Sequence, residues 1–344
     1  MMPLKGMILD QALGFHLSIK IYAMIKQSIK LFLYFLTFIG FTSIGIAQTQ
    51  IGDDINSESG KGEEFGGSIS IDTHGDRVAI GDHKNDGTGT DAGHVRAFEL
   101  NSSNNWVQMG SDIDGEAAGD NFGVDVSMSY DGNRIVIGAE NNDSWGQIIR
   151  KYVDDSALED YLGASVSISG DYAIVSASGD DDAGNLSGSA YIFIRSGTNW
   201  TQQAKIVASD AAAGDGFGSS VSIAGDYAIV GANNDDDGGS DSGSAYIFIR
   251  SGTSWSQQEK LVASDAAAED DFGSSVSISG DYAVVGAYGD DDAGNLSGSA
   301  YIFIRSGTSW SQQEKLVASD PAASDYFGID VSISGNNVVV GASN

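Results

Sequence analysis

Residues 217–270 read FGSSVSIAGDYAIVGANNDDDGGSDSGSAYIFIRSGTSWSQQEKLVASDAAAED, and the chain repeats this stretch along most of its length. The next copy is almost identical, and earlier copies are more diverged. Because one such unit is too small to bury its own apolar faces, a repeat of this length predicts units that stack on one another. The copies begin at Phe65, Phe122, Leu162, Phe217, Phe272 and Phe327, and the last four are spaced 55 residues apart.

Each unit contains four strand-like stretches separated by turn residues. In the quoted copy, small polar and apolar residues alternate over 219–224, and a Gly225-Asp226 turn leads into YAIVGA. The stretches 244–250 and 255–263 complete the set. A meander of four antiparallel strands cannot bury both of its faces alone, and stacked meanders close most simply into a β-propeller. The sequence therefore predicts an all-β propeller of four-stranded antiparallel blades.

Two of the six expected blades are incomplete. The copy at Phe122 is followed by Leu162 after only 40 residues, so it lacks the acidic loop and the third strand. The last copy stops after its second strand, residues 336–342. Residues 50–55 resemble 108–113, the fourth strand of the first copy, so we expect this segment to complete the last blade. The sequence predicts about six blades in all.

The repeated landmarks also carry a family resemblance. Phe-Gly opens the unit, Val-Gly-Ala follows about fourteen residues later, as at 230–232 and 285–287, and Gly-Ser-Ala-Tyr-Ile-Phe comes next. This pattern resembles the FG-GAP repeat of integrin α-chain propellers and of many bacterial secreted proteins. The resemblance extends over Gln50–Asn344, so we assign 48–344 to one propeller domain. Integrin-type propellers have seven blades, which implies seven here if the chain is a fragment.

The N-terminal 47 residues have the pattern of a signal peptide. Residues 31–47 form an apolar run, Lys26 and Lys30 precede it, and small residues close it at Ala47. A basic end, an apolar stretch and a small-residue cleavage site are the features of an export signal. We expect Met24 to be the true start of translation and cleavage to occur near Ala47. The mature protein is then secreted or held at the cell surface, with no membrane insertion after cleavage. The alternative is an uncleaved anchor, although 17 residues are at the short limit for a span.

Composition excludes several function classes. The formal net charge of −31 repels phosphate backbones, so nucleic acid is not an expected partner. The chain has no cysteine, and we recognise no nucleophile elbow or zinc-binding helix. His74, His83 and His94 all lie in the first copy, where exposed turn histidines are the main expectation and a metal site is the alternative. We therefore expect a protein that is not an enzyme.

The acidic loops that follow Gly-Ala are the candidate metal sites. Calcium takes six to eight oxygen ligands, often from carboxylates at alternate positions of a Gly-containing loop. Family resemblance does not supply these ligands, because the integrin calcium loop lies between Phe-Gly and Gly-Ala, where this chain has only a tight turn. Solvated loops that aid solubility are the alternative. The candidate calcium ligands are Asp235, Asp237 and Asp241 in one loop, Asp82, Asp86 and Asp91 in another, and the pairs Asp180 with Asp182 and Asp290 with Asp292.

These features together predict a monomeric, non-catalytic adhesion or binding scaffold for an extracellular protein or polysaccharide. A calcium-binding structural module of a larger surface protein is the alternative, and a polysaccharide hydrolase or lyase is a third possibility. The recurring tryptophans favour packing between blades over a ligand-stacking platform, because they stand at the same place in successive copies. The five are Trp106, Trp145, Trp200, Trp255 and Trp310.

Overall fold

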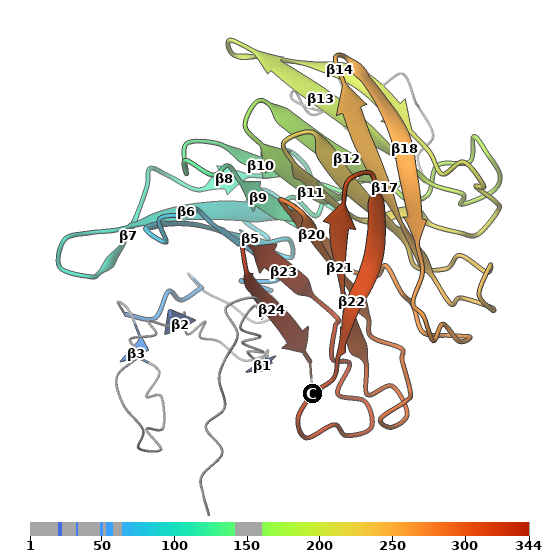
Figure 1. Ribbon diagram of the computed structural model, residues 1–344. Coiled ribbons are helices and arrows are strands. Elements are labelled where there is room, and N and C mark those ends of the chain that lie inside the picture. Colours follow the sequence, from blue (N-terminus) through green and yellow to red (C-terminus); the bar gives the residue numbers. More distant parts are fainter. Residues whose placement is uncertain are drawn as a thin grey trace, which may run out of the picture.

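The computed structural model describes residues 53–57, 64–141 and 160–343, and it also describes three short strands nearer the N-terminus. Every regular element among these residues is a β-strand (Figure 1). None of the described residues forms a helix of the length and apolarity needed to cross a membrane. The three short strands are β1 (Lys20–Tyr22), β2 (Phe32–Leu33) and β3 (Thr49–Gln50).

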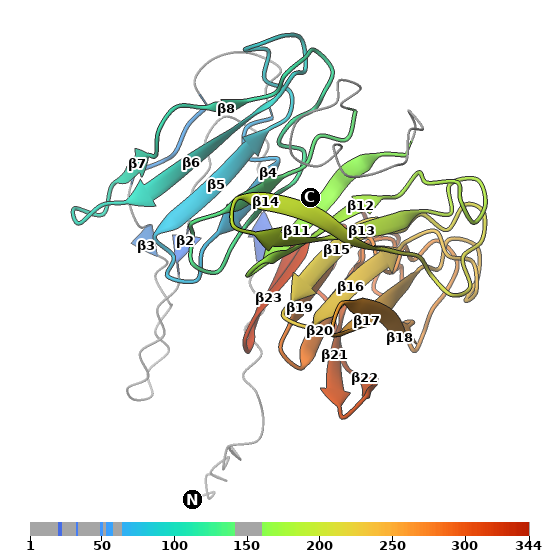
Figure 2. The same ribbon diagram turned by 90° about the horizontal axis from the view of Figure 1, so that it is seen from above.

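Three consecutive sheets are complete four-stranded antiparallel blades whose strands follow chain order. They lie side by side in Figure 2, and their first strands are in contact. The predicted all-β propeller of four-stranded blades is thereby confirmed. The strands are β11 (Leu162–Ser169), β12 (Tyr172–Ala177), β13 (Ser189–Ser196) and β14 (Asn199–Ile206); β15 (Phe217–Ala224), β16 (Tyr227–Ala232), β17 (Ser244–Ser251) and β18 (Ser254–Leu261); and β19 (Val276–Ser279), β20 (Tyr282–Ala287), β21 (Ser299–Ser306) and β22 (Ser309–Leu316).

The other three blades also follow the repeat. The first has four strands in chain order plus a short fifth strand, β8, which pairs with β6. The second shows two strands among the described residues, and residues 142–159, which carry the tail of the second copy with Trp145, lie outside them. The last has two strands of its own copy, beside which β1 forms a third. The strands are β4 (Ser68–Ile71), β5 (Arg77–Asp82), β6 (His94–Leu100), β7 (Trp106–Gln108) and β8 (Ile113–Asp114); β9 (Val126–Met128) and β10 (Ile135–Ile137); and β23 (Val331–Ser334) and β24 (Asn337–Ala342).

An N-terminal segment lies beside the last blade. It is β1, which pairs with β24 in parallel orientation. Gln50 pairs with Phe32 in the sheet of β2 and β3, and Ile55 is buried against Val78, Ile80 and Phe98 of the first blade. The expectation that residues 50–55 complete the last blade stays a prediction, because residues 51 and 52 lie outside the described residues. Most of the predicted signal peptide lies outside the described residues.

Adjacent blades are held together by hydrogen bonds that we call the serine ladder. The first strand of each blade is an edge strand, so some of its backbone N–H groups have no strand partner. Serine hydroxyl oxygens of the preceding blade accept them: Ser165 Oγ from Val221 N at 3.1 Å and Ser167 Oγ from Ile223 N at 3.2 Å. Equivalent bonds join Ser68 to Val126, Ser70 to Met128, Ser127 to Ile168, Ser220 to Val276, Ser222 to Ile278, Ser275 to Val331 and Ser277 to Ile333.

Behind the ladder, the phenylalanine of each Phe-Gly fills the interface between blades. Phe217 is fully buried, with its ring centroid 5.5 Å from that of Tyr246 and 5.9 Å from that of Phe248. The same apolar cluster includes Ile174 and Ile192 of the preceding blade. Burying a side chain of this size stabilises the fold by about 2–3 kcal/mol.

The recurring tryptophans pack where the sequence predicted. Trp255 lies edge-on to Tyr172 of the preceding blade, with ring centroids 6.3 Å apart, and its Nε1–H donates to Gln203 Oε1 at 2.9 Å. Trp310 makes the same ring contact with Tyr227, at 6.2 Å. In these two copies the packing interpretation is confirmed, and the indole links the outer strands of neighbouring blades.

One glycine in each interface is required by close backbone approach. Gly243 has a φ of +79°, and a Cβ there would lie 2.0 Å from the backbone oxygen of Phe272 in the next blade. Gly252, in a turn at the other end of the blade, also has a positive φ of +64°, but a Cβ there would meet nothing within 4 Å.

The pair provides a test of blade stacking. Gly252→Ala should lower the free energy of unfolding by about 1 kcal/mol, because only the backbone conformation is strained. Gly243→Ala should lower it by about 3 kcal/mol, because the blades must also separate locally. Urea unfolding of both variants measures the difference. Equal losses would show that the close approach between blades does not contribute to stability.

Candidate functional site

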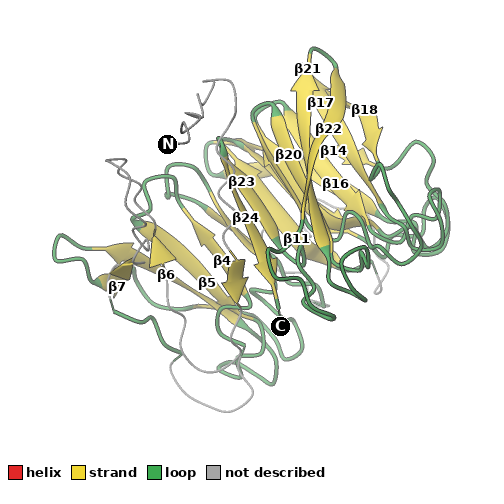
Figure 3. Cartoon of the chain, turned by 60° about the horizontal axis from the view of Figure 1, so that its bottom comes forward, coloured by secondary structure: helices red, strands yellow, loops and turns green. Residues whose placement is uncertain are grey.

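The acidic loops between the second and third strands share one conformation. In the loop between β16 and β17, Asp235 Oδ1 accepts the amide of Asp237 at 3.0 Å, and Asp236 Oδ1 accepts the amide of Asp241 at 2.8 Å. Asp241 itself has a φ of +52°. The corresponding contacts recur in the preceding blade, where Asp180 Oδ1 accepts from Asp182 and Asp181 Oδ1 from Leu186. Aspartates therefore hold the shape of these loops, which lie along one edge of the sheets (Figure 3).

A lysine lies where the loop carboxylates meet. The Nζ of Lys260 is 2.9 Å from Asp210 Oδ2, 2.9 Å from Asp235 Oδ2 and 2.6 Å from Asp237 Oδ2. It also lies 5.3 Å from the ring centroid of Tyr246, whose hydroxyl donates to Asp235 at 2.7 Å. Asp210 comes from the exit of the preceding blade, so the contact joins two blades. We call this arrangement the lysine–aspartate cluster.

The cluster recurs at the same place in two other blades. Around Lys315 the distances to carboxylate oxygens of Asp265, Asp290 and Asp292 are 2.8, 2.7 and 2.7 Å. Lys205 lies 2.6 Å from Asp180 and 2.7 Å from Asp182. The buried aspartate of each of these three loops, Asp180, Asp235 or Asp290, is thus paired with an internal cation.

The pKa values in the cluster follow from this pairing. Burial opposes ionisation of Asp235, but hydrogen bonds from Lys260 and Tyr246 outweigh it and hold its pKa below the usual range. Burial also disfavours the charged form of Lys260, yet its contacts with Asp237, Asp210 and Asp235 raise its pKa. Burial and the Asp235 carboxylate together raise the pKa of the Tyr246 hydroxyl. Lys260 and Asp235 therefore stay charged at neutral pH.

The structure brings together only part of the predicted calcium ligands. Asp235 and Asp237 do converge, as do the pairs Asp180 with Asp182 and Asp290 with Asp292, but each set surrounds a lysine. Asp241 does not join its loop partners, since its amide is bound by Asp236 and its carboxylate lies 3.4 Å from the Ser240 hydroxyl.

In the first blade the predicted set Asp82, Asp86 and Asp91 does not converge on one point among the described residues. Asp86 Oδ1 accepts the amide of Asp91 at 2.9 Å, whereas Asp82 is buried on β5.

Sequence reasoning missed the lysines and the aspartates of the preceding blade. The signal was present in the repeat, because Lys260 stands five residues after Trp255 and Asp265 five residues after Lys260, and the same spacing recurs 55 residues later. The cluster forms across the blade interface, so the lysine of one copy meets Asp210 of the copy before it.

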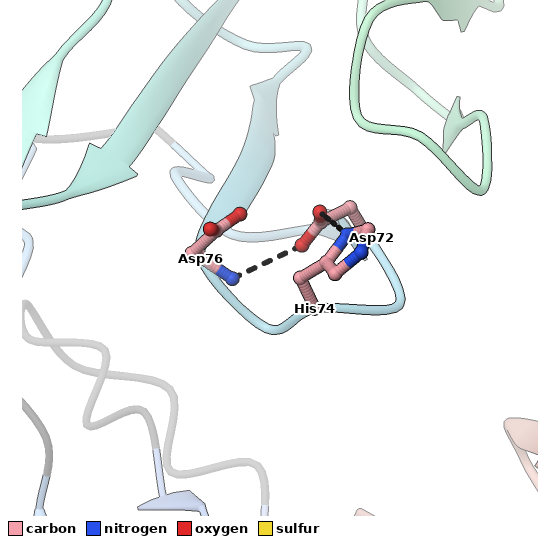
Figure 4. Close-up of side chains that lie close together, drawn as sticks. All are labelled: Asp72, His74 and Asp76. Carbon is pink, nitrogen blue, oxygen red and sulfur yellow. Dashed lines mark hydrogen bonds and ion pairs between the residues drawn. The ribbon is translucent and has the colours of Figure 1, made fainter.

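The three histidines have different surroundings. His74 lies in the turn between β4 and β5 with 65% of its side chain exposed, and its Nδ1 is 3.2 Å from Asp72 Oδ2 (Figure 4). Burial opposes ionisation of Asp72, but the amides of Arg77 and Asp76 and the His74 ring together lower its pKa. The side chain of His83 is 16% exposed, with its Nε2 3.4 Å from Glu64 Oε2, and His94 is 3% exposed on β6. The expectation of exposed turn histidines beside the acidic loop is therefore wrong for His94, and His83 is only partly exposed.

The fold and the repeated loops define a β-propeller whose blades carry one recurring polar cluster. The FG-GAP repeat family matches residues 145–193, 200–248, 255–303 and 310–344, which is more than half of the chain. The chain belongs to the FG-GAP repeat family. The matches that start at Trp200, Trp255 and Trp310 each begin at the second residue of a fourth strand, and the first three matches end in the third strand of a blade. The repeat is therefore offset from the blade. No curated protein sequence matches the chain.

Several solved structures are similar in shape at low sequence identity. A putative 6-phosphogluconolactonase from Bacteroides uniformis has 12% identity and a TM-score of 0.48, over 84% of this chain and 81% of that one. The periplasmic gluconolactonase PpgL of Pseudomonas aeruginosa has 13% identity and a TM-score of 0.47, over 74% and 73%. A functionally unknown protein from Desulfotomaculum acetoxidans has 11% identity and a TM-score of 0.48, over 86% and 81%.

Removing the internal cation should destabilise the propeller. Lys260→Met leaves the Asp235 carboxylate, whose side chain is 4% exposed, without its ion-pair partner. Loss of one partner of a buried pair lowers the free energy of unfolding by about 3 kcal/mol or more. The double variant Lys260→Met/Asp235→Asn should recover part of this loss, because no unpaired charge remains there. A loss below about 1 kcal/mol for the single variant, as for a surface pair, would contradict a stabilising role.

The acidic edge should also give a measurable pH dependence. Burial raises the pKa of Asp270 to about 6 and the Asp290 charge adds to this, although the Ala267 amide partly offsets both. Its value in the unfolded chain is near 3.8. The folded chain thus binds the extra proton between about pH 4 and 6, so the free energy of unfolding rises as the pH falls through this window.

In denaturant unfolding, the free energy of unfolding should rise by about 1 kcal/mol less for Asp270→Asn than for the parent protein when the pH falls from 7 to 5. The variant keeps a side-chain oxygen for the Ala267 amide, which donates to Asp270 at 2.7 Å. Burial also raises the pKa of Asp125 to about 6. The free energy of unfolding of the variant should therefore still increase somewhat as the pH falls. If the free energy of unfolding of the variant depends on pH as steeply as that of the parent protein, Asp270 does not titrate in this range.

Proposed function

We propose that this chain is an extracellular, non-catalytic binding scaffold whose acidic loops contact a protein with a basic surface. The observation that carries the proposal is the exposed aspartate at the same place in three consecutive loops, Asp181, Asp236 and Asp291. The loops share one backbone conformation, so the three carboxylates form a repeated row along one edge of the propeller. A row of identical groups at fixed spacing favours a partner that meets several of them at once.

The distribution of charge supports this choice. The buried loop aspartates are neutralised by Lys205, Lys260 and Lys315. Asp181, Asp236 and Asp291 take part in no ion pair within the described part of the chain, and they remain exposed. With a net charge of −31, this surface attracts cationic partners and repels acidic polysaccharides. A basic protein surface is thus favoured over a polysaccharide.

The near identity of the blades supports a role in binding. A catalytic site needs groups of different function at one place, such as an acid and a base, whereas these loops present the same groups in each copy. Propellers with repeated edges are well suited to binding extended surfaces, because each blade offers the same contact.

Binding should depend on the row of exposed carboxylates. Residues 48–344 would be applied to an array of extracellular proteins and polysaccharides, and hits among basic proteins would be measured by surface plasmon resonance at low and high salt. Replacing Asp181, Asp236 and Asp291 with Asn should weaken binding at low salt at least about tenfold, because three screened charges are lost.

The control variant replaces Asp171, Asp226 and Asp281 with Asn. These aspartates are also exposed and lie in the turns between first and second strands, at the opposite end of each blade. The change in net charge is the same, so a specific loop surface predicts little effect. Equal weakening by both variants, or no basic ligand on the array, would contradict the proposal. Turnover of a polysaccharide would overturn the non-catalytic assignment.

A calcium-loaded structural module is the second candidate, and the convergence of Asp210, Asp235 and Asp237 within 4.8 Å of one another favours it. The Lys260 ammonium group lies 2.6–2.9 Å from these same three carboxylates and supplies one positive charge at the place that an ion would take. Calorimetry with calcium on chelator-treated protein, repeated on Lys260→Met, distinguishes the calcium-loaded module from a scaffold that binds no calcium. Heat and a higher melting temperature in the parent protein would favour the calcium module.

A further inference from the structure

The first blade lacks the lysine–aspartate cluster. Gly93 occupies the repeat position of Gly243. Three residues further on, the first blade has Arg96 where the blade of Gly243 has Tyr246. In those blades Tyr246 is paired with Lys260, whereas the register of β6 with β8 places Asp112 opposite Arg96. A carboxylate therefore replaces the internal ammonium group, and the surrounding residues change with it.

Three strands of this blade place polar side chains in one row. Asp82 of β5 pairs directly with His94 of β6, and His94 pairs directly with Asp114 of β8. Residues directly opposite one another in antiparallel strands share a face, and their Cβ atoms are about 5 Å apart. Asp112, two residues before Asp114, is on the same face. His94, Asp112 and Asp114 each offer a ligand atom within 4.8 Å of the other two.

Two buried atoms in the row have no hydrogen-bond partner. Asp82 is 1% exposed, and its Oδ2 is unpartnered, while its Oδ1 accepts the amide of Glu64 at 2.9 Å. His94 is 3% exposed, and its Nε2 is likewise unpartnered. Buried polar atoms in native proteins are almost always hydrogen-bonded, so each such exception calls for an explanation. Burial raises the pKa of Asp82, and the Glu64 amide and the two nearby histidines only partly offset this effect.

We propose that His94, Asp112 and Asp114 bind a divalent first-row transition metal ion such as Zn²⁺, and that Asp82 positions the His94 ring. A metal-bound histidine commonly donates its other ring N–H to a carboxylate. In the metal-bound protein, Nε2–H of His94 donates to Asp82 Oδ2, which satisfies both of the atoms that have no partner in this structure and leaves Nδ1 for the ion. An imidazole nitrogen with carboxylate oxygens suits zinc, whereas calcium prefers oxygen ligands alone.

The surroundings of Asp112 fit a ligand that is held in place. Gln108 Nε2 donates to Asp112 Oδ1 at 2.6 Å, and Arg96 Nε lies 3.6 Å from the same oxygen. Arg96 also donates to Gln108 Oε1 through two nitrogens, at 3.1 and 2.8 Å. These contacts fix Oδ1 and leave Oδ2 of Asp112 available for the ion. Outer contacts of this kind orient metal ligands and tune their affinity.

The second histidine cluster of the chain serves as an internal control. Asp72, His74 and Asp76 also lie within 4.8 Å of one another. His74 is mostly exposed, however, and Asp72 Oδ1 already accepts the amides of Asp76 and Arg77 at 3.0 and 3.1 Å. Since this turn is satisfied by its own backbone, it does not require an ion.

The test is a calorimetric titration of Zn²⁺ into the chelator-treated protein, together with the absorption spectrum of bound Co²⁺. We expect one tight equivalent above the weak background of an acidic surface. His94→Gln should lower the affinity at least about 100-fold, and Asp114→Asn should weaken it as well without unfolding the protein, because Asp114 is exposed. Asp82→Asn should lower the affinity about 10- to 100-fold and shift the Co²⁺ spectrum, as expected for a positioning residue.

His74→Gln is the matched control and should leave the tight equivalent unchanged. If His94→Gln does not fold, Asp114→Asn and the Co²⁺ spectrum of the parent protein still decide the question. The proposal is overturned if Asp114→Asn binds Zn²⁺ as tightly as the parent protein, if His74→Gln alone removes the tight equivalent, or if the parent protein shows only the weak background.

Discussion

An edge strand with open backbone amides is the constraint on which this propeller depends. The first strand of each blade is paired with the second strand on one side and with no strand on the other. The N–H groups on its open side therefore need acceptors outside the sheet. Serine hydroxyls at alternate positions of the preceding blade supply them, as Ser220 and Ser222 do for Val276 and Ile278. The alternation of serine and apolar residues thus has two purposes, because the apolar positions face the interface core while the serines join successive blades.

Buried carboxylates, like the open backbone amides, are satisfied by groups placed at the interfaces between blades. Buried carboxylates would destabilise the interfaces between blades, yet Asp235 and Asp290 are each within 3 Å of a lysine ammonium group. The tyrosine hydroxyls that donate to them complete the hydrogen bonding. Each lysine balances the buried carboxylate of its cluster, whereas a second aspartate of the same cluster, such as Asp237 with 69% of its side chain exposed, faces solvent. Much of the negative charge of these loops is therefore carried at the surface.

Among the blades with four strands in chain order, divergence is concentrated in the first one. There Arg96 stands in place of the tyrosine of the cluster and His94 in place of a serine, and the register of β6 with β8 brings Asp112 opposite Arg96. The strand framework is unchanged, because β5 and β6 keep the register of the later blades. A repeat fold allows this kind of local change, since each blade contacts only its neighbours. Residues that break the symmetry of a repeat are consequently the first place to look for a specialised site.

Local alternation and a period that recurs along the chain were enough to predict the all-β class and the succession of four-stranded blades. They also indicated that the loop aspartates need a cation. The lysine beside these carboxylates is seen only in the folded chain, since Lys260 meets Asp210 and Asp235 across a blade interface that no single unit contains. The same holds for Asp82, His94 and Asp114, which stand far apart in the sequence and become neighbours only when three strands pair in register.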